Sequence, residues 1–195
     1  MGAYGRNNQA SADTYGSYLS PTNIGSPGQD YGSDHHSIDG GGAIILSVEG
    51  TLTLNADIMA DGDSPKGSWI DGGGSGGSMW LTASNLAGSG TLSSDGGDAP
   101  NTGPDAVGAQ PGASGGGGGG RIAVILTHTE TFGGVLITAY GGEGGNQDGA
   151  AGTLYLQKAS ETSTSGHLIV DNLGYDGLDN LQMNNQGMMS IGLFL

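Results

Sequence analysis

The stretch that decides the fold is 115–125, GGGGGGRIAVI, in which six glycines are followed directly by a short apolar strand. Glycine this frequent opposes helix formation, whereas β-branched residues such as Ile122 and Val124 favour strands. The same order, glycine and then alternating apolar residues, occurs three more times along the chain. The sequence therefore predicts a repeat of short β-strands, each introduced by glycine.

The four copies align into columns of similar residues. Their strands are expected at residues 43–47, 78–82, 121–125 and 153–157. The second and fourth residues of every strand are apolar, and alternation of side chains between the two faces predicts that both point into a common interior. These residues are Ile44, Met79, Ile122 and Leu154, followed by Leu46, Leu81, Val124 and Leu156. The third residues are predicted to point outward or into a second layer, and they are Ile45, Trp80, Ala123 and Tyr155.

A second, shorter strand follows each copy and ends on glycine, with Ile58, Leu92, Ile137 and, in a weaker fourth copy, Val170 as its interior residues. Strands too thin to bury a face alone are stabilised by stacking on one another. We therefore predict an all-β fold, a Gly-rich parallel β-helix or solenoid of about four coils. An antiparallel β-sandwich of four hairpins is the alternative. The glycine runs are expected where backbone approaches backbone closely.

The repeats divide the chain into three parts. We expect residues 1–39 to form an N-terminal Gly/Tyr/Asp-rich segment packed on the solenoid, residues 40–174 to hold the repeats, and residues 175–195 to form a C-terminal capping or subunit-exchange segment. This end is unusually apolar, and we expect it either to cap the last coil or to pair with the next subunit. The residues predicted to mediate self-association are Met188, Met189, Ile191, Leu193, Phe194 and Leu195.

The composition excludes several classes of partner. The 195 residues include 19 acidic and 4 basic ones, for a formal net charge of -15, so nucleic acid and anionic membranes should repel the chain.

There is no cysteine, which excludes disulfides and thiolate metal sites. No apolar stretch approaches the roughly 18 residues needed to insert into a membrane. The first six residues lack the apolar run of a signal peptide.

Acidic turns are the candidate metal sites. Asp61 and Asp63 flank one glycine, and Asp95 and Asp98 flank a pair of glycines at the equivalent point of the next copy. Turns can supply the several oxygen ligands that Ca²⁺ requires. We therefore predict structural calcium at these four residues, with ordinary turn formation by Asp and Gly as the alternative. No other cofactor is expected.

The few large aromatic side chains are the candidate surface contacts. Aromatic residues are enriched where proteins meet partners, and aromatic faces also stack on sugar rings. Packing in the core is the alternative role. The candidates are Tyr15, Tyr18, Trp69, Trp80, Tyr140 and Tyr155.

The layout resembles a Gly-rich repeat of large bacterial surface and secreted proteins. Members carry a glycine run followed by an Arg-Ile-Ala-Ile-type strand and then a strand that ends in an Ala-x-Gly-Gly turn; residues 115–124 and 137–142 match these two parts. The segment 15–25 is similar to the family's stretch before its first glycine run, so the resemblance covers most of residues 15–174. It implies a solenoid exposed outside the cell and transfers no catalytic residue. Phage tail-tip adhesins with packed polyglycine are a weaker similarity.

Three functions follow, in order of preference. The first is a non-enzymatic structural module of an extracellular fibre or cell-surface assembly, in which copies form an oligomer or filament through the solenoid ends. The second is an adhesin that recognises a surface glycan through aromatic residues and loops. The third is a polysaccharide-active enzyme, which the scarcity of basic residues for stabilising a developing anion disfavours.

Overall fold

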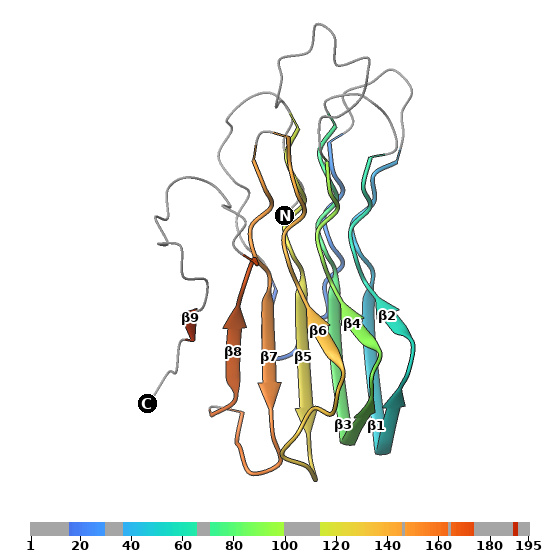
Figure 1. Cartoon of the computed structure of the whole chain (residues 1–195), viewed down its shortest axis with the longest axis vertical. Coiled ribbons are helices and arrows are strands. Elements are labelled where there is room, and N and C mark those ends of the chain that lie inside the picture. The colour runs from blue at the N-terminus through green and yellow to red at the C-terminus, as the bar shows by residue number, and fades with distance from the viewer. Residues whose placement is uncertain are drawn as a thin grey trace, which may run out of the picture.

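The computed structural model describes residues 16–29, 37–65, 71–99, 114–145, 147–163, 165–173 and 189–190. One sheet contains β1 (Ala43–Leu54), β3 (Ser78–Gly88), β5 (Arg121–Leu126), β7 (Thr153–Gln157), β8 (His167–Val170) and β9 (Met189–Ser190), in that order. The other contains β2 (Asp57–Met59), β4 (Thr91–Ser93) and β6 (Leu136–Thr138). All regular structure in these ranges is β, so the all-β prediction is confirmed (Figure 1). None of the described residues forms a helix long and apolar enough to cross a bilayer.

The first sheet is mainly parallel, and its register is the one predicted from the sequence columns. Ala43 lies opposite Ser78, Ser78 opposite Arg121, and Arg121 opposite Thr153. The predicted interior positions therefore line up across the four strands. Parallel pairing is the opposite of what the alternative of antiparallel hairpins requires.

The second sheet confirms three of the four predicted short strands. Ile58, Leu92 and Ile137 lie opposite one another in parallel β2, β4 and β6. The prediction for Val170 is wrong, because β8 pairs antiparallel with β7 in the first sheet. A turn at residues 158–161 helps to reverse the chain after β7, and the Lys158 N–H donates to the Glu161 carboxylate over 2.8 Å to close it.

The core lies between the two sheets (Figure 1). Ile122 and Val124 are completely buried at the middle of the stack, and Leu92 faces them from the second sheet with 1% of its surface exposed. In the same columns, Ile44 and Leu46 of the outermost strand β1 are only partly buried. Leu154 and Leu156 of β7 are also only partly buried, so burial falls from the middle of the ladder towards β1 and towards β7 alike.

Beyond the strands, the glycine runs form a hydrogen-bonded lattice. The N–H groups of residues 72–77 donate in three directions in turn, so that every third residue bonds to the same neighbouring segment. A period of three residues is that of a polyproline II helix. The donors are Gly72 and Ser75 to residues 26–29, Gly73 and Gly76 to residues 115–118, and Gly74 and Gly77 to residues 60–63.

Glycine is required in this lattice by space. A Cβ added at Gly117 would overlap the carbonyl oxygen of Gly74, and one added at Gly76 would overlap that of Ser94. Neither glycine has a positive φ. Close packing of backbone against backbone, with no room for a side chain, therefore explains the glycine runs, as the sequence led us to expect.

The described part of the N-terminal segment packs on this lattice. The Gly25 N–H donates to the Gly41 carbonyl over 2.7 Å, and the Ser26 N–H donates to the Ser75 hydroxyl over 2.6 Å. The Ser78 hydroxyl donates to the Asn23 carbonyl over 2.6 Å. Residues 23–26 are thus held by both backbone and side chains.

Candidate functional site

The acidic turns hold one strand to the next. Asp61 accepts hydrogen bonds from the Asp95 N–H at 2.7 Å and from the Ser93 hydroxyl at 2.9 Å. Asp95 accepts in the same way from the Tyr140 N–H at 2.6 Å and from the Thr138 hydroxyl at 2.9 Å. Each of these two carboxylates therefore spans the gap between neighbouring strands of the second sheet.

The other two predicted metal ligands are exposed. Asp98 accepts a hydrogen bond from the Glu143 N–H at 2.8 Å, and the backbone of Asp63 bonds to Asp39 and Gly74. In the described ranges no three His, Cys, Asp or Glu side chains come together as a metal site. The structure gives Asp61 and Asp95 hydrogen-bonding roles, and calcium at the four aspartates stays a prediction.

Asp95 has a perturbed acidity. Burial raises the pKa of its carboxyl above the ordinary 3.8, and the hydrogen bonds from Tyr140 and Thr138 oppose that rise. The negative charges of Asp61 and Asp98 raise the pKa further. Ionisation of Asp95 is therefore disfavoured in the folded chain, although the hydrogen bonds from Tyr140 and Thr138 satisfy both carboxylate oxygens.

Of the predicted aromatic contacts, Tyr155 is corrected to a buried residue. Only 3% of its surface is exposed, and its hydroxyl donates to the Ser163 carbonyl over 3.0 Å. Tyr18 meets it edge-on, with ring centroids 5.9 Å apart, and is itself 46% exposed. Alternation along β7 correctly placed Tyr155 away from the core, but it could not show that residues from outside the strand cover this ring.

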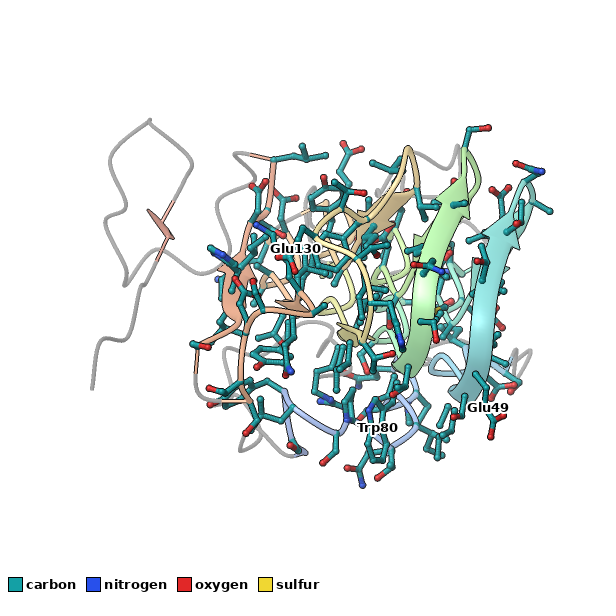
Figure 2. The ribbon with its side chains drawn as sticks, turned by 90° about the horizontal axis from the view of Figure 1, so that it is seen from below. Glu49, Trp80 and Glu130 are labelled. Atoms are coloured by element: carbon teal, nitrogen blue, oxygen red, sulfur yellow. The ribbon has the colours of Figure 1, made fainter. Side chains whose placement is uncertain are left out.

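The remaining aromatic candidates are dispersed. Trp80 lies half-buried on the outer face of β3, on the side where the N-terminal segment packs (Figure 2). Tyr140 is half-buried beside Asp95, two residues after β6 of the second sheet. Tyr15 and Trp69 lie outside the described residues. The structure therefore brings only Tyr18 and Tyr155 into contact among the described candidates.

One end of the stack is open. Among the described strands, β1 pairs with β3 alone and β2 pairs with β4 alone. Ile45 on β1 is 64% exposed and Met59 on β2 is 61% exposed. A Cβ built at Gly42 or Gly50 would meet no atom of the described chain within 4 Å. The end therefore presents a strand edge and partly exposed apolar residues together. Figure 2 shows Glu49, at the register shift of β1, on this edge.

The opposite end is covered by antiparallel strands. β8 pairs with β7, and the backbone of β9 pairs with β8 in the same chain, at Val170 and Met189. The Asn172 side chain accepts a hydrogen bond from the Gly141 N–H at 2.7 Å and donates one to the Gly149 carbonyl at 2.9 Å. Of the predicted self-association residues, Met188, Ile191, Leu193, Phe194 and Leu195 lie outside the described residues.

The sequence did not reveal a surface cavity of about 260 Å³ beside the third glycine run. Backbone of 118–120 and 150–152 lines it, together with Tyr18 and Arg121. Glycine carries no side-chain pattern, so residue type alone gave no signal there. The signal that could have found the cavity is the alignment of the second and third glycine runs, which places Gly118 level with Ser75.

No protein-family model matches the chain, and no curated protein or solved structure matches it either. Its function is therefore inferred from its own residues.

Proposed function

We propose that the chain is a non-enzymatic β-solenoid module of an extracellular fibre or cell-surface assembly, and that copies associate through the ends of their stacks. The mainly parallel, in-register ladder supports this, because each added strand repeats the columns of the one before. Such a stack continues wherever an end is not covered.

The observation that carries the proposal is the open edge of β1. Ile44, Leu46 and Val48 belong to columns that are fully buried further along the stack, yet they are only partly buried here. A strand edge that no described strand pairs, beside core residues that are only partly buried, is a template for another strand. A strand with apolar residues at every second position would complete both the hydrogen bonds and the core.

The C-terminal sequence has that pattern. Met189, Ile191, Leu193 and Leu195 alternate with other residues. Pairing of this segment from one copy with β1 of the next would be a heterologous contact, which leads to a filament when it does not close. Each copy carries a formal net charge of -15, so we expect association to strengthen as salt screens the repulsion.

Electron microscopy of the purified chain tests association. We expect filaments, and we expect removal of residues 188–195 to abolish them. Val48→Lys places a charge in the open edge and should also prevent assembly, whereas Ile24→Lys, at an exposed position of the N-terminal segment, should not. Dispersed particles from the unaltered chain at every salt concentration would refute the proposal.

An adhesin that binds a surface glycan is the second candidate, and one feature favours it. The chain leaves the described lattice between residues 29 and 37, 65 and 71, and 99 and 114. These exit points are neighbours: the Asp63 N–H donates to the Asp39 carbonyl at 2.9 Å, and the Asp98 N–H donates to the Ser64 hydroxyl at 2.8 Å. The described residues that flank these three segments, one of which contains Trp69 in its sequence, therefore lie at the same end of the lattice (Figure 1).

A glycan array probed with the monomeric chain distinguishes the two functions. Binding that is lost in Trp69→Ala and retained in Trp80→Phe would favour the adhesin. Filaments without glycan binding would favour the structural module.

A further inference from the structure

The cavity beside Tyr18 occupies a regular position of the glycine lattice. Counting back three residues from the paired Ser78 and Arg121 places Ser75 level with Gly118. The neighbouring positions of the two runs behave alike: Gly76 and Gly119 each donate to the next run, and Gly77 and Gly120 each donate to a segment that follows a short strand. The third direction differs between the runs.

In that direction the second run donates to residues 26–29, and the third run has no acceptor among the described residues. The Ser75 N–H donates to the Ser26 carbonyl over 3.0 Å, and the Gly72 N–H donates to the Gln29 carbonyl over 2.9 Å. Within the described chain, the N–H of the buried Gly118 has no hydrogen-bond acceptor, and this residue lines the cavity. Buried backbone donors nearly always have an acceptor, so the position calls for one.

We propose that this cavity is a docking site for a peptide in the polyproline II conformation, supplied by a partner protein. The lattice indicates the ligand, because residues 26–29 make the corresponding contact one run earlier through the carbonyls of Ser26 and Gln29, which lie three residues apart. A docked peptide would place a carbonyl oxygen on the Gly118 N–H. This inference goes beyond association through the stack ends and does not depend on it.

The lining residues fit such a ligand. The walls at 118–120 and 150–152 carry no side chain larger than a methyl group, so a peptide backbone can approach them closely. The exposed Tyr18 ring supplies the aromatic surface against which polyproline II segments commonly pack. The Arg121 guanidinium, which donates to the Ser78 hydroxyl over 3.3 Å, also lines the cavity. The net charge of -15 disfavours acidic peptides, and the close approach to the glycine walls together with the polyproline II conformation favours a Gly- and Pro-rich segment.

Amide NMR on the ¹⁵N-labelled full chain tests the proposal. The probe is a peptide of Pro-Gly-Gly repeats about nine residues long, which spans three turns of polyproline II. Its control is the same peptide made with D-proline, which favours the opposite hand. We expect the L-peptide to shift the Gly118 amide and to slow its hydrogen exchange at least about tenfold, and the D-peptide to do neither.

Variants locate the site. Ala150 is exposed and lines the cavity, so Ala150→Leu should fill the space and weaken peptide binding at least about tenfold without harming the fold. Ala56→Leu, at an exposed alanine away from the cavity, should bind normally. Equal binding of the two peptides, or an unchanged Gly118 amide at saturation, would overturn the proposal. Protection of Gly118 in the free protein would also overturn it, because the chain itself would then fill the position.

Discussion

The carboxylate of Asp61 accepts a hydrogen bond of 2.7 Å from the backbone N–H of Asp95, so the acidic turn after β2 positions the backbone of the acidic turn after β4. Substituting Asp61 by Ala leaves that N–H and the Ser93 hydroxyl without their acceptor. We expect Asp61→Ala to lower the free energy of unfolding by about 1–3 kcal/mol in urea titrations.

The matched control is Asp63→Ala, two residues away, because the Asp63 side chain is exposed. It should change stability by less than about 0.5 kcal/mol. Equal losses from the two substitutions would show that the hydrogen bonds of Asp61 contribute nothing specific.

The raised pKa of Asp95 predicts that the stability of the chain depends on pH. Burial raises the pKa of Asp95 in the folded chain, so the folded state holds this proton more tightly than the unfolded state. The stabilisation from this difference is complete at pH values below the pKa of Asp95 in the unfolded chain. It is lost as the pH rises through the higher pKa of Asp95 in the folded chain. Asp95→Asn cannot titrate and keeps a carbonyl oxygen for the Tyr140 N–H.

Unfolding of the two proteins between about pH 3 and pH 7 measures this effect. We expect the stability of the unaltered chain relative to Asp95→Asn to decline as the pH increases. A relative stability that instead grows with pH would mean that the hydrogen bonds to the carboxylate, and not its burial, control the titration.

The glycine lattice predicts a sharp contrast between two Gly→Ala substitutions. Gly117→Ala would force a Cβ into the carbonyl oxygen of Gly74, and the facing backbone cannot move without breaking its own bonds. We expect the free energy of unfolding to fall by more than about 3 kcal/mol, or folding to fail. Thermal unfolding followed by circular dichroism measures the change.

Gly50→Ala is the control, since a Cβ there meets no described atom within 4 Å and the residue has no positive φ. It should be neutral or stabilise the chain by up to about 1 kcal/mol. A comparable loss in both variants would mean that glycine serves backbone conformation and not close packing.

The columns of the first sheet predict that the stability lost on shortening an apolar side chain to Ala depends on which strand carries it. Ile122 is fully buried, whereas Ile44 occupies the same column at the open edge and is only partly buried. We expect Ile122→Ala to cost about 2–5 kcal/mol and Ile44→Ala clearly less, as measured by urea unfolding of dilute protein. At concentrations where copies associate, the cost of Ile44→Ala should rise, because the proposed partner strand buries this residue.

Much of the fold could be predicted from side chains. Alternation along residues 43–46 and their three counterparts sufficed to predict the register, because a shift by one residue would turn the apolar set away from the core. The prediction for Val170, the interior residue of the weaker fourth copy, failed. Its pairing depends on the turn that Lys158 and Glu161 close, and the alignment of repeats did not include that turn.

The candidate site was less predictable, for two physical reasons. Strand alternation tells which side chains leave the core, but what covers them comes from elsewhere, as Tyr18 covers Tyr155. In the glycine runs the information lies in the backbone, where every residue looks the same. That the Ser75 N–H has an acceptor, and the Gly118 N–H has none in the part of the chain that the structure describes, therefore follows only from the arrangement in space.

The glycine lattice also affects how stability varies with temperature. Its residues are joined by peptide hydrogen bonds and bury few apolar groups, so unfolding exposes an unusual share of polar backbone to water. Apolar exposure raises the heat capacity of unfolding and polar exposure lowers it. The heat capacity change per residue should thus fall below the usual value of about 12–15 cal/mol/K. A small heat capacity change flattens the stability curve, so the folded chain retains its stability across a wide range of cold and warm surroundings.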